Sequence, residues 1–321
     1  MNKLAAALLS AIFSFVSRLP LSTAFTVGEL FGRFACQVAW IIGRNRIGMI
    51  NLRLAFGREK SKGQFRKILK EMWINFGRSA VEFARFPRYS RENISRFVSW
   101  ENFDRLVRPR ERGRGVIAMT AHFGNWDLLA LSTGLNGLPV NLITKHMRSK
   151  FVTDTWMKQR ARGGVNPIFK KEARREIISI LKKNGLVGFV LDQDTKPKEG
   201  GIFVDFFGRK ASTLSAPALL SEKRDTPVVP LFLVRESRFK HRAFVEEPIE
   251  FEKVGDNHEH NVVHNTRRYL EVLERYIRKY PEQWLWIHRR WRRRPPGEPP
   301  VYTGAAGKRR RRHPDGVPHN S

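Results

Sequence analysis

A histidine and an aspartate five positions apart are the residues of this chain best suited to acid–base chemistry. His122 and Asp127 stand in the stretch Ala-His-Phe-Gly-Asn-Trp-Asp. An imidazole can take a proton from a hydroxyl near neutral pH, and a carboxylate on its other nitrogen fixes the tautomer and stabilises the imidazolium. Asn125, between them, could add a hydrogen-bond donor to a substrate.

The spacing alone is not specific. With 9 histidines in this chain and 30 carboxylates, about one His-x4-Asp/Glu match is expected by chance. His241 and Glu246 are such a match. They stand in an alternating, strand-like pattern without turn residues, so we interpret that pair as structural.

The residues around His122 predict a strand, a turn and a helix. Residues 115–120 are strand-like, Gly124 and Asn125 make the turn, and a helix begins near Asp127. On a continuous helix, residues five apart diverge by about 140°, whereas a turn lets Asp127 fold back onto the ring. The free N–H groups at the helix N-terminus suit an oxyanion or a phosphate. The alternative is that Asp127 only caps the helix and His122 hydrogen-bonds a loop.

No Gly-x-Ser-x-Gly elbow is present in the sequence, so a covalent acyl-enzyme is not suggested. A histidine and carboxylate alone suit direct attack of an acceptor hydroxyl on an activated acyl group.

The other predicted elements alternate between strands and helices. Helices are predicted by the apolar spacing of residues 64–88, 172–183 and 261–280, and strands over 140–144, 186–191, 228–234 and 243–249. Such alternation predicts an α/β fold, a layered sheet flanked by helices.

The first 45 residues differ from the rest of the chain. Apolar runs cover 4–16, 19–27 and 34–43, and none reaches the ~18–20 residues of an unambiguous spanning helix. We expect residues 1–45 to be an N-terminal apolar helical membrane anchor, either a short tilted span or helices in the interface. Basic residues over 44–62 place the following chain in the cytoplasm by the positive-inside rule. A cleaved signal peptide fits less well, because Arg18 and Pro20 separate its possible cleavage site, Ser-Thr-Ala at 22–24, from the first apolar run. A buried helical hairpin is the remaining alternative.

The charge balance calls for an anionic neighbour. Lys and Arg number 60 against 30 Asp and Glu, a net charge of +30, which favours nucleic acid, an anionic leaflet or acidic partners. We expect the main domain to cover 46–295 and a disordered basic tail to cover 296–321, because the tail is rich in Pro, Gly and Arg. The single cysteine, Cys36, permits neither an internal disulfide nor a multi-cysteine zinc site.

Three stretches together resemble one family. They are His122-Phe-Gly-Asn-Trp-Asp127, then Leu191-Asp-Gln-Asp194 with the Gly-Gly-Ile-Phe-Val-Asp-Phe-Phe-Gly-Arg run after it, and Tyr280-Pro-Glu-Gln-Trp-Leu-Trp-Ile-His-Arg-Arg-Trp291. In this order they are similar to the bacterial lipid A biosynthesis acyltransferases, the lauroyl/myristoyl branch of the lysophospholipid acyltransferase superfamily. The resemblance covers roughly residues 1–295, and it implies a glycerolipid acyltransferase-like fold.

The resemblance implies an enzyme of the bacterial inner membrane, with its catalytic domain on the cytoplasmic side. It would move a fatty acyl chain from acyl carrier protein to a hydroxyl of a Kdo-bearing lipid A precursor, without a metal or redox cofactor. His122 would be the general base and Asp127 its orienting partner. Many lipid A members carry Glu at the second position. Asp is shared with relatives that acylate other glycolipids, which leaves another glycolipid or a lysophospholipid open as the acceptor.

Further residues are candidate substrate contacts. Arg148 and Arg209 suit phosphate or carboxylate groups, although a surface salt bridge is the alternative for each. Asp192 and Asp194 follow a strand, a common place for site residues, where they could hold Arg209 or a sugar hydroxyl, or cap a helix. Aromatic side chains could line a groove, mark a membrane interface or fill the core: Phe203, Phe206, Phe207, Trp284, Trp286 and Trp291.

A basic nucleic-acid-binding protein is the alternative from another class. Aromatic residues are interleaved with arginines over 284–294. This interpretation explains neither the apolar N-terminus nor the turn at His122, so nucleic acid is not the expected partner.

Overall fold

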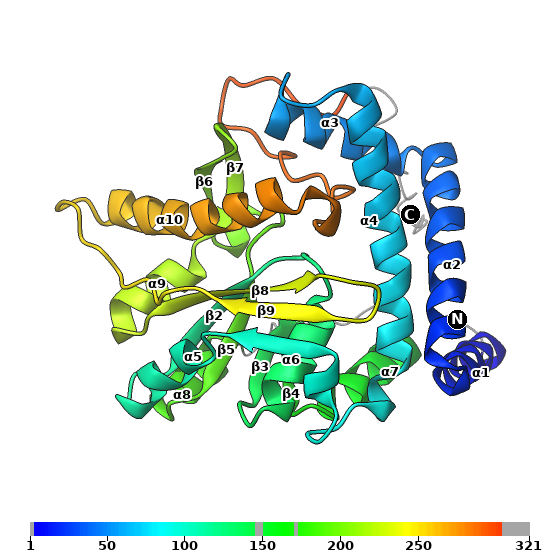
Figure 1. Cartoon of the computed structure of the whole chain (residues 1–321). Helices are drawn as coiled ribbons and strands as arrows, with labels where there is room; N and C mark the ends of the chain where they lie inside the picture. The colour runs from blue at the N-terminus through cyan, green and yellow to red at the C-terminus, as the bar shows by residue number, and fades with distance from the viewer. Residues whose placement is uncertain (1–2, 145–149, 170–172, 304–321) are drawn as a thin grey trace, which may run out of the picture.

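A mixed sheet forms the centre of the protein. The computed structural model describes residues 3–144, 150–169 and 173–303 (Figure 1). Within these residues the main sheet has seven strands in the order β1-β9-β8-β2-β5-β3-β4. All neighbours are parallel except β8 and β9. The strands are β1 (Val98–Glu101), β2 (Val116–Thr120), β3 (Val140–Thr144), β4 (Val165–Phe169), β5 (Leu186–Val190), β8 (Val228–Arg235) and β9 (His241–Val245).

Helices cover both faces of this sheet. Side chains alternate along a strand, so β2 sends Val116 and Ala118 into one apolar cluster and Ile117 and Met119 into the other. The first cluster includes residues of α5 (Asp104–Glu111), α6 (Trp126–Leu135) and α7 (Lys150–Ala161). The second includes residues of α8 (Ala173–Lys182), α9 (Ala216–Arg224) and α10 (His258–Lys279). The predicted α/β sheet flanked by helices is confirmed.

A separate hairpin lies beside α10. It consists of β6 (Gly201–Phe206) and β7 (Arg209–Leu214). Phe206 and Phe207 are buried in the core, where Phe206 contacts the rings of Trp284 and Trp291 and Phe207 contacts that of Phe56. These two rings therefore fill the core and do not line a groove.

The long predicted helix is observed as α4 (Lys62–Ala84). It begins at a capping box, in which Ser61 accepts from the backbone of Gln64 and the Gln64 side chain accepts from the backbone of Ser61. Figure 1 shows α4 standing at the edge of the sheet, with α2 outside it. One strand is shorter than predicted: β9 ends at Val245, and Ile249 forms only an isolated bridge to Val228.

The N-terminal helices are α1 (Lys3–Arg18), α2 (Leu21–Ile41) and α3 (Arg44–Phe56). Helix α2 packs closely on α4 because glycines meet at the crossing. A Cβ at Gly77 would lie 2.0 Å from the carbonyl oxygen of Gly28, and one at Gly32 would lie 2.4 Å from that of Trp73. Small residues spaced by four let helix backbones approach in this way. Helix α2 is thus packed directly against α4, which stands at the edge of the sheet.

The outward face of α2 is apolar and exposed. Leu30 is 60% exposed, Phe34 67% and Ile41 84%. Among the described residues, no single helix combines the length and apolar character needed to cross a bilayer. The pair α2 and α3, bent by 89°, meets the requirement only when taken together. The membrane anchor therefore stays a prediction.

The C-terminal segment after α10 completes the core. Trp284, Trp286 and Trp291 are at most 1% exposed, so they pack inside the protein and do not form an interfacial belt. Tyr302 is also buried, and its hydroxyl donates to Asn51 Oδ1 at 2.6 Å. The folded domain thus extends beyond the boundary expected at residue 295. Residues 304–321 of the expected tail lie outside the described residues.

Candidate active site

Two neighbouring strands bring His122 and Asp192 together. The parallel register pairs Thr120 of β2 with Val190 of β5, so the residues two positions further on meet at the carboxyl edge of the sheet. His122 Nδ1 lies 2.8 Å from Asp192 Oδ1, and Trp284 Nε1 donates to Asp192 Oδ2 at 2.8 Å. The imidazole is therefore held by a buried carboxylate that is itself held by an indole.

The turn after His122 requires a glycine. Gly124 has a φ of +56°, and a Cβ there would lie 1.9 Å from the carbonyl oxygen of Leu233. The C-terminal segment holds the same turn by two backbone hydrogen bonds. Gly124 N–H donates to Gln283 O at 2.8 Å, and Leu285 N–H donates to His122 O at 3.1 Å. The position of the imidazole is thus fixed by segments from three parts of the chain.

The carboxylate on His122 differs from the one expected. Asp127, in the first turn of α6, accepts at Oδ1 from Nε of Arg160 at 2.7 Å and is also paired with its Nη2 at 2.6 Å. Asp127 is 5% exposed. The predicted bond from Asp127 to His122 is corrected, since that hydrogen bond goes to Asp192. The reason is tertiary: β5 lies beside β2, and α7 brings a guanidinium to Asp127.

The electrostatics favour a histidine that can hold a proton. Burial lowers the pKa of His122, but the charge and hydrogen bond of Asp192, with the charge of Asp127, outweigh it, so the pKa is raised above its ordinary value. Burial would raise the pKa of Asp192, yet His122 and the Trp284 N–H lower it to about 2. An ionised Asp192 keeps the proton on Nδ1 of the neutral ring and leaves Nε2 as the basic nitrogen.

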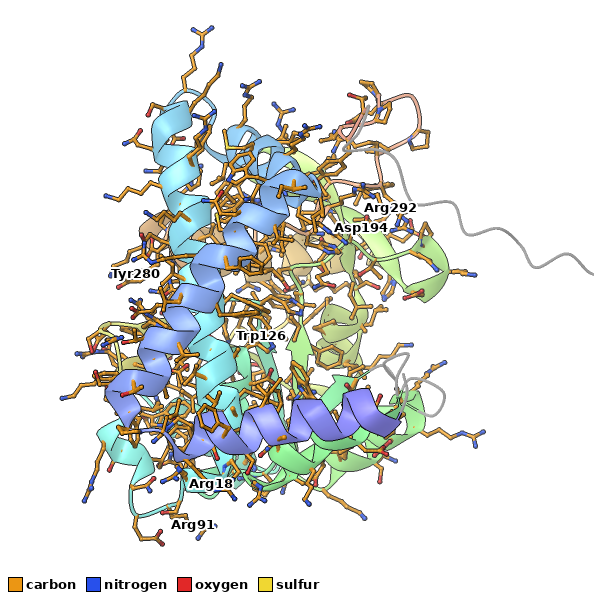
Figure 2. All side chains as sticks on the ribbon, turned by 90° about the vertical axis from the view of Figure 1, so that its right-hand side faces the viewer. Arg18, Arg91, Trp126, Asp194, Tyr280 and Arg292 are labelled. Carbon is orange, nitrogen blue, oxygen red and sulfur yellow. The ribbon has the colours of Figure 1, made fainter. Side chains whose placement is uncertain are left out.

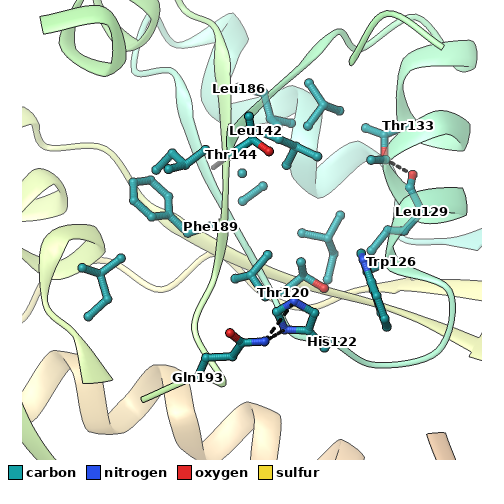
Figure 3. A pocket seen from close by; sticks show the side chains of 18 of the residues that line it. Thr120, His122, Trp126, Leu129, Thr133, Leu142, Thr144, Leu186, Phe189 and Gln193 are labelled. Atoms are coloured by element: carbon teal, nitrogen blue, oxygen red, sulfur yellow. Dashed lines mark hydrogen bonds between the residues drawn. The ribbon is translucent and has the colours of Figure 1, made fainter. Parts of the chain in front are cut away.

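Two further side chains restrict the ring. The Gln193 amide nitrogen lies 3.1 Å from Nδ1 and 3.3 Å from Nε2 of His122. The Trp126 ring meets the imidazole edge to face, with centroids 4.9 Å apart. Figure 3 shows His122, Gln193 and Trp126 together at one end of a pocket. Rotation of the imidazole is therefore limited on more than one side.

This pocket has a volume of about 360 Å³ and reaches from His122 into the space between α6 and the sheet. Figure 3 shows Leu142 and Leu186 at the end far from His122. The deeper walls are largely apolar, with Leu129, Ala130, Val140, Leu142, Leu186 and Leu231 among the lining residues. A cavity of this kind suits an extended apolar group whose reactive end lies beside the imidazole.

Asn125 is used inside the protein. Its Oδ1 accepts from the N–H of Leu128 at 3.0 Å and so caps α6, while its Nδ2 donates to Glu82 at 2.7 Å. The side chain is 4% exposed. The expected contact from Asn125 to a substrate is therefore corrected to a positioning contact, because both ends of the amide already have partners.

The remaining candidates are spread out. Asp194 lines the pocket and is paired with Arg293, and burial raises its pKa. Arg209 is exposed at the start of β7. Neither aspartate holds it: Asp192 is bonded to His122 and Trp284, and Asp194 to Arg293. Arg148 lies outside the described residues.

A buried charged cluster behind the turn was not predicted. Glu82 of α4 is 1% exposed and forms a two-pronged ion pair with Arg235 at 2.7 Å for both contacts. His241 Nε2 lies 3.3 Å from Glu82, and burial lowers the pKa of His241 to about 4. Glu246 accepts instead from the Tyr276 hydroxyl at 2.6 Å. His241 is thus structural, as expected.

Sequence reasoning also missed Arg160 and the link to Trp284. A glutamate within the apolar spacing of α4 was a signal for Glu82, and an arginine directly after the apolar run of β8 was one for Arg235. Arg160 stands in an ordinary basic helix, which gave no signal. Among the described residues no group of three or more His, Cys, Asp or Glu side chains could hold a metal ion.

Comparison with known proteins agrees with this geometry. Residues 3–293 match the family model of the bacterial lipid A biosynthesis acyltransferases. The chain is 26% identical to the lipid A biosynthesis palmitoleoyltransferase of Escherichia coli (strain K12) over 263 residues, which cover 81% of this chain and 82% of the relative. It is 26% identical to the myristoyltransferase of the same strain, covering 83% and 80% of the two chains. For the lauroyltransferase of that strain the identity is 24%, covering 89% and 91%. The chain therefore belongs to the bacterial lipid A biosynthesis acyltransferase family and is an acyltransferase.

Proposed function

We propose that this acyltransferase moves a fatty acyl chain from acyl carrier protein to a hydroxyl of a lipid A precursor, with His122 as the general base. The observation that carries the proposal is the hydrogen bond between the half-buried His122 and the buried Asp192 at one end of an apolar pocket. The family supports lipid A as the acceptor class, and acyl carrier protein as donor would supply the acyl group as an activated thioester.

The proposed reaction is a direct displacement. Asp192 accepts the hydrogen bond from Nδ1–H, and Nε2 of His122 takes the proton of the acceptor hydroxyl as its oxygen attacks the thioester carbonyl. A new C–O bond forms and the tetrahedral intermediate then breaks its C–S bond. The imidazolium returns the proton to the leaving thiolate, so no covalent acyl-enzyme is needed.

The pocket supports a binding mode for the acyl chain. Its apolar end between α6 and the sheet would hold the hydrocarbon, which leaves the thioester carbonyl beside His122. Arg160 also lines the pocket. Its guanidinium, fixed by Asp127, and the N-terminus of α6 could both stabilise the oxyanion of the intermediate. In this proposal Asp127 acts in two ways: it holds Arg160 in place, and its charge raises the pKa of His122.

Charge and exposure support the remaining parts of the proposal. A net charge of +30 favours an acidic carrier protein, a phosphorylated acceptor and an anionic leaflet. The exposed apolar face of α2 suits contact with a membrane. We therefore place the enzyme at the bacterial inner membrane with the sheet domain in the cytoplasm. Asp at position 127 keeps another glycolipid open as the acceptor.

The test is acyl transfer with a substitution that keeps a hydrogen-bond donor for Asp192 but removes the basic ring nitrogen. His122→Asn, assayed with acyl carrier protein as donor and a Kdo-bearing lipid A precursor as acceptor, should lose activity by roughly 10²–10⁴-fold. His258→Asn is the matched control, because His258 is exposed on α10 and paired with Glu222 away from the pocket. Mass spectrometry identifies the lipid that gains the acyl group. Near-wild-type turnover of His122→Asn would contradict the proposed base, and acylation of a different lipid would contradict the acceptor.

A further inference from the structure

A second cavity lies between α2 and α4, apart from the His122 pocket. It has a volume of about 530 Å³, and the two cavities share no lining residue. Arg33, Cys36, Gln37 and Trp40 line it from α2, and Arg66 and Lys70 from α4. Residues three or four apart share a face of a helix, so each helix presents its contribution on one side. We call this cavity the α2–α4 groove.

The groove is cationic and its charge is not compensated. Arg33, Arg66 and Lys70 are exposed, and none of them pairs with another of the described residues. No acidic side chain stands among the described residues that line it. Further along the same helices the cations are neutralised, since Arg78 of α4 is paired with Glu29 of α2. The groove is therefore suited to an anion that comes from outside the chain.

The exposed apolar stripe of α2 favours a lipid headgroup as the source of this anion. Val27, Leu30, Phe31, Phe34 and Ile41 recur at helical spacing and are 42% to 84% exposed. On α1, Ile12 and Phe15 are 48% and 64% exposed. Arg33 adjoins Phe34 in the sequence, so one of the three cations of the groove lies next to the apolar stripe. A helix with this pattern binds at the boundary between headgroups and acyl chains.

The place of these helices agrees with such contact. Figure 2, which looks onto the side of the molecule where α1 and α2 lie, shows both helices in front of the sheet domain. The α2–α4 crossing is close, because Gly28, Gly32 and Gly77 let the two backbones approach each other directly. Anchoring at the groove would thus fix the orientation of α4, whose buried Glu82 holds Asn125 behind the His122 turn.

We propose that the α2–α4 groove binds the phosphate of an anionic phospholipid headgroup while the apolar stripe of α2 enters the acyl region of the same leaflet. The inference rests on the membrane location proposed above, but not on the acyl-transfer mechanism. A single-stranded nucleic acid would also meet the three cations, yet it would leave the neighbouring apolar stripe without a partner.

The test is vesicle co-sedimentation of the purified full chain. One set of vesicles contains phosphatidylcholine alone. In the second set, phosphatidylglycerol replaces part of the phosphatidylcholine. The triple variant Arg33→Gln/Arg66→Gln/Lys70→Gln should lose about tenfold or more of its preference for phosphatidylglycerol, because each cation near an anionic surface contributes to binding. The matched control is Arg174→Gln/Arg175→Gln/Lys182→Gln on α8. These cations are also exposed, and Figure 1 shows α8 on the side of the molecule away from α2. The control should change the preference less than about twofold, since charges beyond a Debye length from the membrane are screened.

A second variant tests the apolar stripe by itself. Leu30→Ser/Phe34→Ser should weaken binding to both kinds of vesicle while the preference for phosphatidylglycerol persists. Glycerol phosphate in solution should not displace the protein from vesicles, because the lipid site includes the stripe. Displacement by glycerol phosphate would show a free-anion site and overturn the proposal.

Three other results would also overturn it. The groove variant could keep the wild-type preference, both triple variants could lose it equally, or the groove variant could lose only binding to a single-stranded oligonucleotide. His122→Asn should bind both vesicles as the wild type does. A failure of acyl transfer and a failure of lipid binding are therefore measured separately.

Discussion

The His122 ring carries the proposed chemistry, and its neighbours set the pH at which it works. Its pKa is raised above 6.5: burial opposes this, but the charge of Asp192 outweighs burial. Only the neutral ring can accept a proton, so the rate should rise with pH through this raised pKa and level off above it. The protonated ring is stabilised by folding, so this contribution to stability is full below 6.5 and is lost as pH rises through the raised pKa.

Removing the charge on Asp192 should move this profile. Asp192→Asn leaves burial largely unopposed, so the acid limb of the pH–rate profile should shift to lower pH, and kcat should fall by roughly 10²–10⁴-fold because the tautomer is no longer fixed. Asp127→Asn is the control, since Asp127 raises the pKa of His122 by its charge without a hydrogen bond to the ring. Its acid limb should shift in the same direction but less. A larger shift in Asp127→Asn than in Asp192→Asn would show that Asp127 is the partner of His122.

At the scale of elements, one buried carboxylate joins three of them. Glu82 of α4 binds Arg235 at the end of β8 and Asn125 at the start of α6. Burial would raise the pKa of Glu82, but Arg235 and its other partners lower it below 4.5. Its contribution to stability is therefore present above 4.5 and is lost as pH falls through the lowered pKa. The cluster holds the base of the His122 turn in place.

Neutralising this carboxylate should destabilise the fold. Glu82→Gln leaves the guanidinium of Arg235 buried without its counter-charge, which should cost about 3–5 kcal/mol of the free energy of unfolding. Glu111→Gln is the control, because Glu111 is exposed at the end of α5. Denaturant unfolding at neutral pH measures both variants. A change below about 1 kcal/mol in Glu82→Gln would mean that Arg235 finds water or another partner.

The turn itself offers a second test at this scale. Gly124→Ala would place a Cβ 1.9 Å from the carbonyl oxygen of Leu233 at a positive φ, so the turn must move and displace His122. Gly137→Ala is the matched control, with a φ of +90° and open space around the new Cβ. Both should lose stability of about 1 kcal/mol from the backbone conformation. Only Gly124→Ala should also lose acyl transfer. Equal activity of the two variants would show that the turn tolerates the shift.

At the scale of the whole molecule, the fold creates the pocket between two layers. Strands β2, β3, β5 and β8 form one wall, and α6 forms the other. The apolar end of the pocket therefore depends on how the helix layer packs on the sheet. In the proposed mechanism the depth of this pocket limits the length of the acyl chain, because the thioester of a chain longer than the pocket cannot reach His122.

Filling the pocket should change the choice of acyl chain. Ala130 lines it from α6, so Ala130→Leu should favour shorter chains than the wild type accepts. Competition between acyl carrier proteins loaded with chains of different length measures the ratio of kcat/KM values, which should change by roughly 10-fold or more per pair of methylenes excluded. Retained turnover with the shortest chain excludes misfolding as the cause. An unchanged preference would show that the chain lies elsewhere.

Local sequence signals determined much of this protein. The apolar run of β3, the capping box of α4 and the glycine after His122 each act over a few residues, so the strand, the helix and the turn could be predicted where they occur. The spacing of His122 and Asp127 likewise pointed to the turn that carries the proposed base. Three stretches of similar sequence identified the family before the fold was known.

The tertiary structure decided which of these residues meet. Asp192 lies 70 positions from His122, and only the pairing of β5 with β2 makes it the carboxylate on the ring. Trp284 was ambiguous in the sequence because an indole suits both a membrane interface and a core, and the C-terminal segment placed it beside Asp192. Likewise, the apolar helix α2 became half core and half exposed stripe only through its glycine contact with α4. Sequence patterns report the environment that a side chain favours, whereas the order of strands and the packing of layers determine its partners.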